Sequence, residues 1–322
     1  MADVKALGLV SGGLDSILAA LLLRKAGVEV TGLCLETPFF DAQKAEEAAQ
    51  RYSFPLTVLE VGEEHLQQVV KNPRYGYGSN MNPCIDCHAY MLRKAGQILE
   101  TENYDFLFTG EVLGQRPMSQ NANALKAVAK ASTYGHLVLR PLSAGCLAPT
   151  IMEKQGLVDR AKLADISGRG RKRQMELAKE LGVEHYPAPG GGCLLTDPGF
   201  SRRLRDLLDF QPDCNKNDVE LLKHGRHFRL SAQAKLIVGR NQVDNIALAQ
   251  IAAKSTGWLE LNMAQGPGPL GIFIGCPEQI GLACSLFAAY GPPQDGESKV
   301  RVGQQVINTQ PASKRHAQEY IL

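Results

Sequence analysis

Short apolar runs alternate with amphipathic stretches over the first 140 residues of the chain. Apolar runs bounded by glycine or polar turns are typical of buried strands, whereas apolar residues at every third or fourth position are typical of helices. The pattern predicts strands at residues 6–10, 30–35, 56–61, 106–109 and 137–139. It predicts helices at residues 15–25, 41–52, 63–70, 88–100 and 121–131. Because strands and helices that alternate in this way form a sheet covered on both faces, we expect an α/β fold with a doubly wound parallel sheet.

The pattern changes after residue 140. Residues 141–212 are rich in Gly, Pro and Arg, with one predicted helix at 172–181. Further on, the pattern predicts helices at 218–223, 242–255 and 277–290 and strands near 228 and at 235–238, 258–261, 270–274 and 299–302. The last dozen residues have the composition of a frayed tail. We therefore expect a first domain at 1–160, a basic linker at 161–215 and a smaller α+β domain at 216–322.

Charge is distributed unevenly along the chain. The 322 residues include 35 Lys and Arg and 33 Asp and Glu, which gives a net charge of +2. Between Arg160 and Arg240, however, sixteen basic residues stand against ten acidic ones, so this segment carries +6 and the remainder −4. Its charge suits a contact with an acidic partner such as RNA. The apolar run Ile17–Leu23 is far shorter than the roughly 20 residues of a membrane span, so we expect a soluble, cytoplasmic protein.

A glycine turn joins the first predicted strand to the first predicted helix, with the sequence Ser11-Gly12-Gly13-Leu14-Asp15-Ser16. Glycines let a ligand approach the backbone closely, and the N–H groups at a helix N-terminus attract anions. Ser11 and Ser16 can donate hydrogen bonds to phosphate oxygens, while Asp15 suits a Mg²⁺ ion or the ordering of the loop. The turn follows neither the GxxxxGK[ST] nor the GxGxxG pattern.

This SGGLDS turn after a buried strand resembles the PP-loop of the ATP-pyrophosphatase superfamily, whose fold is the adenine nucleotide alpha hydrolase-like sheet. The resemblance implies that ATP is cleaved between its α and β phosphates, that a substrate oxygen is adenylated, and that a nucleophile then displaces AMP. By position, it also implies that adenosine contacts the backbone of Cys34 and Leu35 after the second strand. After the fourth strand, the implied contacts are Thr109, Gly110 and Glu111.

Eight cysteines in a chain without a recognisable secretion signal are more typical of thiols or metal ligands than of disulfides. Cys84 and Cys87 form a CxxC pair at the entrance to a helix, where the helix N-terminus stabilises thiolates. Cys193 follows three glycines and is free to approach that pair. Three thiols on a [4Fe-4S] cluster leave one iron open to a group such as hydrosulfide, whereas His88 could complete a zinc site instead. The remaining cysteines are interpreted as core or loop thiols.

Joined to a PP-loop, this CxxC resembles the tRNA thiolation enzymes of the ThiI and MnmA type. In the 2-thiouridine synthetases the first position is commonly Asp, in the stretch NPDxxC, and here NPCIDC has Cys84 in that place. Other members use three cysteines around a [4Fe-4S] cluster. The resemblance therefore implies that Cys84, Cys87 and Cys193 are cluster ligands and catalytic, together with Asp15. In a cluster-free alternative, Cys193 or Cys87 carries a persulfide and the other cysteine resolves it.

Several basic residues are further candidates for contacts with nucleotide or RNA. Arg116 lies in the loop after the fourth strand, and residues 169–173 concentrate four positive charges. The sequence Arg140-Pro141-Leu142 resembles the strand-end RPL of related thiolation enzymes, which implies that Arg140 lies near the nucleotide. The stretch 235–245 resembles the NFACT-R type of RNA-binding domain, found beside ThiI-like PP-loop domains.

The sequence thus predicts a tRNA sulfurtransferase that uses ATP, Mg²⁺ and a [4Fe-4S] cluster. The expected partners are tRNA and either sulfide or a sulfur-donor protein. One alternative is a small-molecule PP-loop amide or sulfur transferase with the cysteines as a zinc staple, and another is an RNA-binding module with a structural nucleotide site. A third is an enzyme that removes sulfur from tRNA. The modified position and the oligomeric state, a homodimer included, are left open by the sequence.

Overall fold

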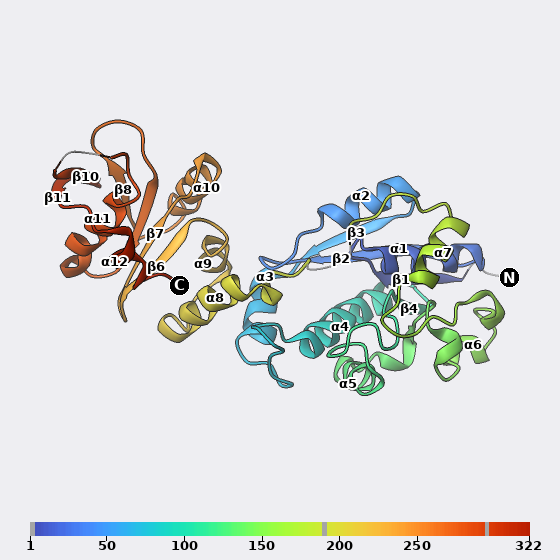
Figure 1. Ribbon diagram of the computed structural model, residues 1–322. Helices are drawn as coiled ribbons and strands as arrows, with labels where there is room; N and C mark the ends of the chain where they lie inside the picture. Colours follow the sequence, from blue (N-terminus) through green and yellow to red (C-terminus); the bar gives the residue numbers. More distant parts are fainter. Residues whose placement is uncertain (1–3, 189–191, 294–295) are drawn as a thin grey trace. The chain divides into compact units, whose positions relative to one another are not determined.

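The computed structural model describes residues 4–188, 192–293 and 296–322. Contacts divide the chain into an N-terminal unit, Met1–Thr196, and a C-terminal unit, Asp197–Leu322 (Figure 1). The segment 161–215, which we expected to be a linker, is therefore shared between the two compact units. Residues 189–191 of the triple-glycine loop lie outside the described residues, whereas Gly192 and Cys193 lie within them.

The N-terminal unit is built on a five-stranded parallel sheet with the order β3-β2-β1-β4-β5. Its strands are β1 (Lys5–Leu9), β2 (Glu29–Glu36), β3 (Leu56–Glu60), β4 (Phe106–Thr109) and β5 (Val138–Leu139). Each strand predicted from the sequence is confirmed to within one or two residues at its ends. The chain reverses its direction of winding between β1 and β4. In such sheets, ligands bind at the carboxyl ends of the strands beside this switch point.

Helices cover both faces of this sheet. The long ones are α1 (Leu14–Lys25), α2 (Gln43–Tyr52), α4 (Cys84–Glu102), α5 (Ala122–Ser132) and α7 (Lys172–Glu180). The short ones are α3 (Gly62–His65), which continues as the π-helix η1 (Leu66–Val70), α6 (Ile151–Lys154), and the 3-10 turns η2 (Gly135–Leu137), η3 (Ala144–Cys146), η4 (Arg160–Lys162) and η5 (Leu194–Thr196). All predicted helices are confirmed, with one change. Helix α4 already begins at Cys84, so the CxxC pair forms its first turn rather than preceding it.

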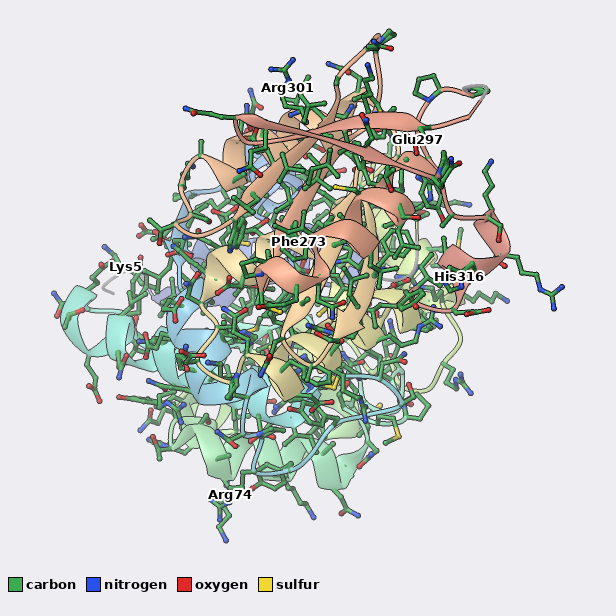
Figure 2. The ribbon with its side chains drawn as sticks, turned by 90° about the vertical axis from the view of Figure 1, so that its left-hand side faces the viewer. Lys5, Arg74, Phe273, Glu297, Arg301 and His316 are labelled. Carbon is green, nitrogen blue, oxygen red and sulfur yellow. The ribbon has the colours of Figure 1, made fainter. Side chains whose placement is uncertain are left out.

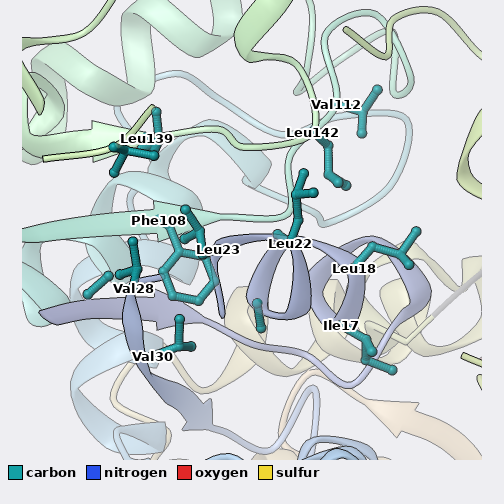
Figure 3. Packing of buried hydrophobic residues seen from close by; sticks show 14 of the residues in the cluster. Ile17, Leu18, Leu22, Leu23, Val28, Val30, Phe108, Val112, Leu139 and Leu142 are labelled. Atoms are coloured by element: carbon teal, nitrogen blue, oxygen red, sulfur yellow. The ribbon is translucent and has the colours of Figure 1, made fainter. Parts of the chain in front are cut away.

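The sheet is held between two apolar layers. On one face, Leu18, Leu22 and Leu23 of α1 belong to the same apolar cluster as Phe108 of β4 (Figure 3). On the other face, the residues of α4 and α5 pack against β1, β2 and β4. Gly8 is required at the centre of β1, because a Cβ atom there would lie 2.0 Å from the Phe108 ring. Tight packing on both faces therefore fixes the strand ends that carry the loops of the site.

The C-terminal unit is a six-stranded antiparallel sheet with the order β11-β10-β8-β9-β7-β6, accompanied by helices. Its strands are β6 (Arg226–Ser231), β7 (Ala234–Val238), β8 (Leu259–Met263), β9 (Leu270–Ile274), β10 (Ser298–Val302) and β11 (Gln305–Thr309). Its helices are α8 (Pro198–Phe210), α9 (Lys216–Leu221), α10 (Gln242–Ala252), the 3-10 turn η6 (Pro277–Gln279), α11 (Ile280–Ala288) and α12 (Lys314–Gln318). The chain is thus an α/β domain followed by a smaller α+β domain, as predicted.

The expectation of a frayed C-terminal tail is wrong. The last dozen residues form α12 and a bridge between Phe228 and Ile321, and Ala317 is fully buried. The backbone N–H of Leu322 also donates to the carbonyl oxygen of His227, 3.0 Å away. The segment has few apolar residues, and the strand it joins, β6, lies about ninety positions earlier, so no local pattern indicated the contact. In the described part of the chain, no helix has the length and apolarity to cross a membrane.

Candidate functional site

The PP-loop lies between the end of β1 and the start of α1. Gly12 has a φ angle of +71°, and a Cβ atom there would lie 2.1 Å from the carbonyl oxygen of Lys44, so only glycine suits this position. Gly13 is the N-cap of α1 and has no side chain that could occupy the first N–H groups of the helix. The hydroxyl of Ser16 donates to the carbonyl oxygen of Gly13, 2.9 Å away, and lies 3.5 Å from the Ser11 hydroxyl. The turn is therefore arranged as an anion site.

Asp15 has one carboxylate oxygen engaged and one without a partner. Its Oδ2 accepts a hydrogen bond from Gln115 Nε2 at 2.6 Å and lies 3.9 Å from Arg171 Nη2. Its Oδ1 is buried and has no hydrogen-bond partner among the described residues. Burial raises the pKa of Asp15, although Gln115 and Arg171 oppose this effect. A buried carboxylate oxygen without a partner is the kind of ligand that Mg²⁺ prefers.

The loop after β4 packs directly on the start of α1. A Cβ atom on Gly110 would lie 2.6 Å from the backbone nitrogen of Ser16, so this close approach requires glycine. Thr109 is buried at the end of β4. On the other side of β1, the pairing with β2 ends at Leu9 and Leu33, so Cys34 and Leu35 continue β2 beyond β1. The structure thus brings all the positions that the resemblance assigned to ATP to one edge of the sheet.

A buried carboxylate, Glu111, connects three elements at this edge. Its Oε2 accepts from Arg140 Nε at 2.9 Å and from Thr109 Oγ1 at 3.1 Å, and its Oε1 lies 2.9 Å from His88 Nδ1. Burial by itself raises the pKa of Glu111, but Arg140 and His88 outweigh it and lower the pKa to about 2. Glu111 therefore stays ionised and ties α4 to the ends of β4 and β5.

The three predicted cysteines are neighbours in the structure. Cys84 and Cys87 lie one turn apart on α4. The segment of Cys193 is attached to the same edge by two hydrogen bonds: Leu194 N donates to Phe39 O at 3.0 Å, and Asn80 Nδ2 donates to Thr196 O at 2.8 Å. Cys193 and Cys84 are close enough to Cys87 to raise its pKa. Each of the eight cysteines, all of them among the described residues, is a free thiol.

The expected stabilisation of thiolates by the helix N-terminus is wrong for Cys87. Burial raises its pKa well above the ordinary value, and burial raises the pKa of Cys193 to about 11. Desolvation disfavours the charged sulfur more than the helix end favours it. His65, whose pKa burial lowers to about 4, places its neutral Nε2 3.2 Å from Cys87 Sγ. In the protein by itself, these groups are therefore uncharged near neutral pH.

Across residues 4–188, 192–293 and 296–322, no group of three or more His, Cys, Asp or Glu side chains converges on a single metal ion. His88, which could complete a zinc site, places its Nδ1 2.9 Å from Glu111 Oε1 and leaves Nε2 as the ring nitrogen for any metal. A [4Fe-4S] cluster differs, since each cysteine binds a different iron and the sulfurs need not meet at one point. Three neighbouring thiols are a donor set of the kind that such a cluster uses.

The charge of Arg116 acts on one residue of the PP-loop and on one of the three cysteines. Arg116 is exposed, and its charge partly opposes the rise that burial causes in the pKa of Asp15 and of Cys193. The helix that carries Cys87 contacts the loop after β4 through His88, whose Nδ1 lies 2.9 Å from Glu111 Oε1. Of the predicted basic stretch 169–173, Arg171 faces Asp15 and Arg173 is paired with Glu176 at 2.7 Å.

Several polar residues of the site were not predicted from the sequence. Gln174 Nε2 donates to Gln115 Oε1 at 2.7 Å, so α7 supports the residue that holds Asp15. His65 was not predicted at all, and Glu111, which the resemblance gave as a nucleotide contact, binds Arg140, Thr109 and His88 instead. No local signal marked His65, because its neighbours in 62–70 include Glu63, Glu64, Gln67 and Gln68.

Replacing Glu111 by Gln should destabilise the N-terminal unit. The carboxylate has a folded-state pKa of about 2 against an ordinary value of 4.5, so its contribution is present above pH 4.5 and disappears as the pH falls toward 2. The difference between these two pKa values corresponds to about 3 kcal/mol of folding stability. The variant also leaves the buried Arg140 without its counter-charge. Hydrogen exchange of β4 and β5 between pH 3 and 7 should show faster opening in Glu111→Gln and a weaker dependence on acid.

The exposed Glu102 offers a matched control, because Glu102→Gln removes an equal charge at the solvated end of α4. Hydrogen exchange of β4 and β5 in Glu102→Gln should depend on pH in the same way as in the unchanged protein. Equal opening rates in the two variants would contradict the assigned connection between α4, β4 and β5.

The fold and the loop define an α/β PP-loop domain joined to a second, antiparallel domain. Residues 2–162, half of the chain, match the family described as thiamine biosynthesis protein (ThiI), and the chain belongs to this family. Residues 225–321 match the NFACT protein RNA binding domain.

Among curated relatives, the chain is similar to the tRNA-specific 2-thiouridylase MnmA of Acidithiobacillus ferrooxidans, with 38% identity over 28% of this chain and 28% of the relative. The MnmA of Micrococcus luteus is 24% identical over 75% of this chain and 67% of that protein. A solved 4-thiouridine synthetase–RNA complex with bound ATP has a TM-score of 0.37 and 21% identity, covering 56% of this chain and 51% of that one.

Proposed function

We propose that this protein is an ATP-dependent tRNA sulfurtransferase, which adenylates a uracil oxygen of tRNA and replaces it with sulfur. The observation that carries the proposal is the shared edge of the sheet: Gly110 packs on the PP-loop at Ser16, and its neighbour Glu111 lies 2.9 Å from His88, the residue that follows Cys87. An ATP site alone would suit many reactions. An ATP site beside three thiols suits activation followed by sulfur transfer.

The PP-loop supports the adenylation step. The N-terminus of α1 and the hydroxyls of Ser11 and Ser16 would hold phosphate oxygens. The unpartnered Oδ1 of Asp15 would hold Mg²⁺, which neutralises phosphate charge when bound. The uracil oxygen forms a bond to the α phosphorus, and the bond between the α phosphorus and the bridging oxygen breaks. Pyrophosphate then leaves with that electron pair.

The cysteines support the sulfur step, in which a sulfur nucleophile attacks the activated carbon and AMP leaves with the carbon–oxygen electron pair. Cys84, Cys87 and Cys193 would hold a [4Fe-4S] cluster, which supplies an open iron for sulfide when bound. The described thiols fit this role because Cys84 and Cys87 lie one turn apart on α4 and the segment of Cys193 is hydrogen-bonded to the same edge of the sheet. His65 Nε2 faces Cys87 Sγ and can donate a hydrogen bond to the ligated sulfur.

The C-terminal unit supports RNA as the substrate. It matches an RNA-binding domain, and the MnmA relatives are by name tRNA-specific. A small-molecule substrate would leave this unit without a role. Binding of RNA by the C-terminal unit, outside the reaction centre, would hold a large substrate in place while the base is activated.

The proposal is tested by mass spectrometry of nucleosides from total tRNA of a strain that lacks the gene, beside its parent. We expect one thiolated nucleoside to disappear and to return when the gene is restored. Unchanged thionucleosides in a strain without a second such enzyme would favour the small-molecule reaction. Accumulation of a thionucleoside would instead indicate that the protein removes sulfur.

A further inference from the structure

The loop 71–82, between η1 and α4, presents aromatic and basic side chains to solvent. Tyr75 and Tyr77 are 39% and 37% exposed, and Arg74 is exposed beside them. The twelve residues include Lys71 and no Asp or Glu, so the loop is positively charged. Large rings are usually buried, and their exposure next to cations is typical of a binding surface.

The loop is held in one conformation although it is exposed. The carboxylate of Asp86 accepts hydrogen bonds from the backbone nitrogens of Arg74, at 3.1 Å, and Tyr75, at 2.9 Å. The hydroxyl of Tyr77 donates to the carbonyl oxygen of Val70 at 2.6 Å, and Gly78 N donates to Asn82 O at 3.0 Å. Because the loop is already ordered, it would lose little conformational entropy when a ligand binds.

The same loop adjoins the cysteines. Its anchor, Asp86, lies between Cys84 and Cys87 in the first turn of α4. Asn80, near the end of the loop, donates to the carbonyl oxygen of Thr196 in the segment that carries Cys193. Helix α4 leads into a parallel strand, so its N-terminus lies at the same edge of the sheet as the PP-loop. A ligand on the loop would therefore lie beside the reaction centre.

The chemistry of the loop suits unpaired RNA. The guanidinium carbon of Arg74 lies 5.7 Å from the centre of the Tyr75 ring, and Arg74 projects outward from the N-terminal unit (Figure 2). Bases that are not paired stack on tyrosine rings, and a guanidinium binds the phosphates between them. Asp86 uses both of its oxygens for the backbone of the loop, so its charge is not presented to a phosphate.

We propose that loop 71–82 binds the unpaired nucleotides next to the target base, with Tyr75 as a stacking platform and Arg74 on a phosphate. This inference rests on the proposed function for the nature of the substrate. It extends that function by assigning RNA recognition to the N-terminal unit as well as to the C-terminal one. Asp86 is then a positioning residue that sets the loop relative to the cysteines.

The test uses the full chain and total tRNA from the strain that lacks the gene. Tyr75→Ala should weaken tRNA binding and raise the KM for tRNA about tenfold, with kcat nearly unchanged. Tyr75→Phe keeps the ring and should bind as the unchanged protein does. Arg74→Ala should reduce the dependence of binding on salt by about one phosphate contact. Lys25→Ala, at the exposed C-terminal end of α1, removes one charge from the opposite edge of the sheet and should change neither quantity.

Ultraviolet crosslinking followed by peptide mass spectrometry should place RNA on Tyr75 or Tyr77. Unchanged tRNA binding in Tyr75→Ala, with no crosslink in residues 71–82, would overturn the inference. So would a Tyr75→Ala variant that binds tRNA normally and loses only transfer from a sulfur-donor protein, since the loop would then bind protein. If tRNA binding depends on loop 71–82 but the protein forms no thionucleoside, the result contradicts the proposed reaction and still supports the loop as an RNA-binding surface.

Discussion

Cys193→Ser should reduce sulfur insertion more than about a thousandfold while pyrophosphate release and AMP attachment to tRNA continue. Cys193 is near the other two cysteines and belongs to a segment that is attached to the sheet edge by backbone hydrogen bonds, so the serine should leave the PP-loop unchanged. Adenylated tRNA should therefore accumulate. The measurement is transfer of label from α-labelled ATP to tRNA, beside the yield of thionucleoside.

Cys146→Ser is the matched control, because Cys146 is an exposed thiol of the same unit. It should retain both activities. Equal loss of adenylation and sulfur insertion in Cys193→Ser would contradict a role in the sulfur step, since the residue would then act on the nucleotide site.

Cysteine-to-serine variants also distinguish the two mechanisms considered for the sulfur step, one with a [4Fe-4S] cluster and one with a persulfide. If the thiols hold a [4Fe-4S] cluster, Cys84→Ser, Cys87→Ser and Cys193→Ser should each lower the iron and acid-labile sulfide of anaerobically prepared protein. If Cys193 and Cys87 form a persulfide and a resolving thiol, Cys84→Ser should keep its activity. In that version the base is first bonded to the outer sulfur of the Cys193 persulfide. Cys87 then loses its proton and attacks Cys193 Sγ, the sulfur–sulfur bond of the persulfide breaks, and the thiolated base leaves with the electron pair. The resulting Cys87–Cys193 disulfide is reduced by an external thiol before the next turnover.

Asp15→Asn should have the opposite effect and abolish adenylation, by at least about a hundredfold, while tRNA still binds. The amide keeps the size of the side chain and an oxygen for Gln115, but it removes the charge that would hold Mg²⁺. Burial raises the pKa of Asp15, so the ionised carboxylate is disfavoured by folding and the neutral amide should not lower stability. The assay is exchange of pyrophosphate into ATP, beside thermal unfolding and tRNA binding.

Asp41→Asn is the matched control, since it removes a carboxylate from the exposed end of the loop before α2. It should leave the exchange reaction within about twofold. Undiminished adenylation in Asp15→Asn would contradict the role given to its unpartnered oxygen. A fall in stability together with activity would assign Asp15 to holding the loop.

The sequence by itself determined the class of the N-terminal fold and the edge of the sheet at which the candidate site lies. Parallel strands all place their carboxyl ends at one edge, so the order of strands and helices was enough to predict that the loops after β1, β2 and β4 would meet there. The SGGLDS turn and the CxxC pair could be found because their functional residues are neighbours in the chain. Local motifs of this kind depend on no distant contact.

Tertiary structure decided the contacts between those loops. Glu111 joins residues 23 and 29 positions away, and Gln115 holds a carboxylate one hundred positions before it. In the sequence these side chains resemble ordinary surface residues, because nothing local shows that they are buried. Burial also decided the state of the cysteines: the helix start predicts a thiolate at Cys87, whereas desolvation keeps it protonated. Desolvation depends on everything that packs around an atom, so it belongs to the folded chain and not to any short stretch of it.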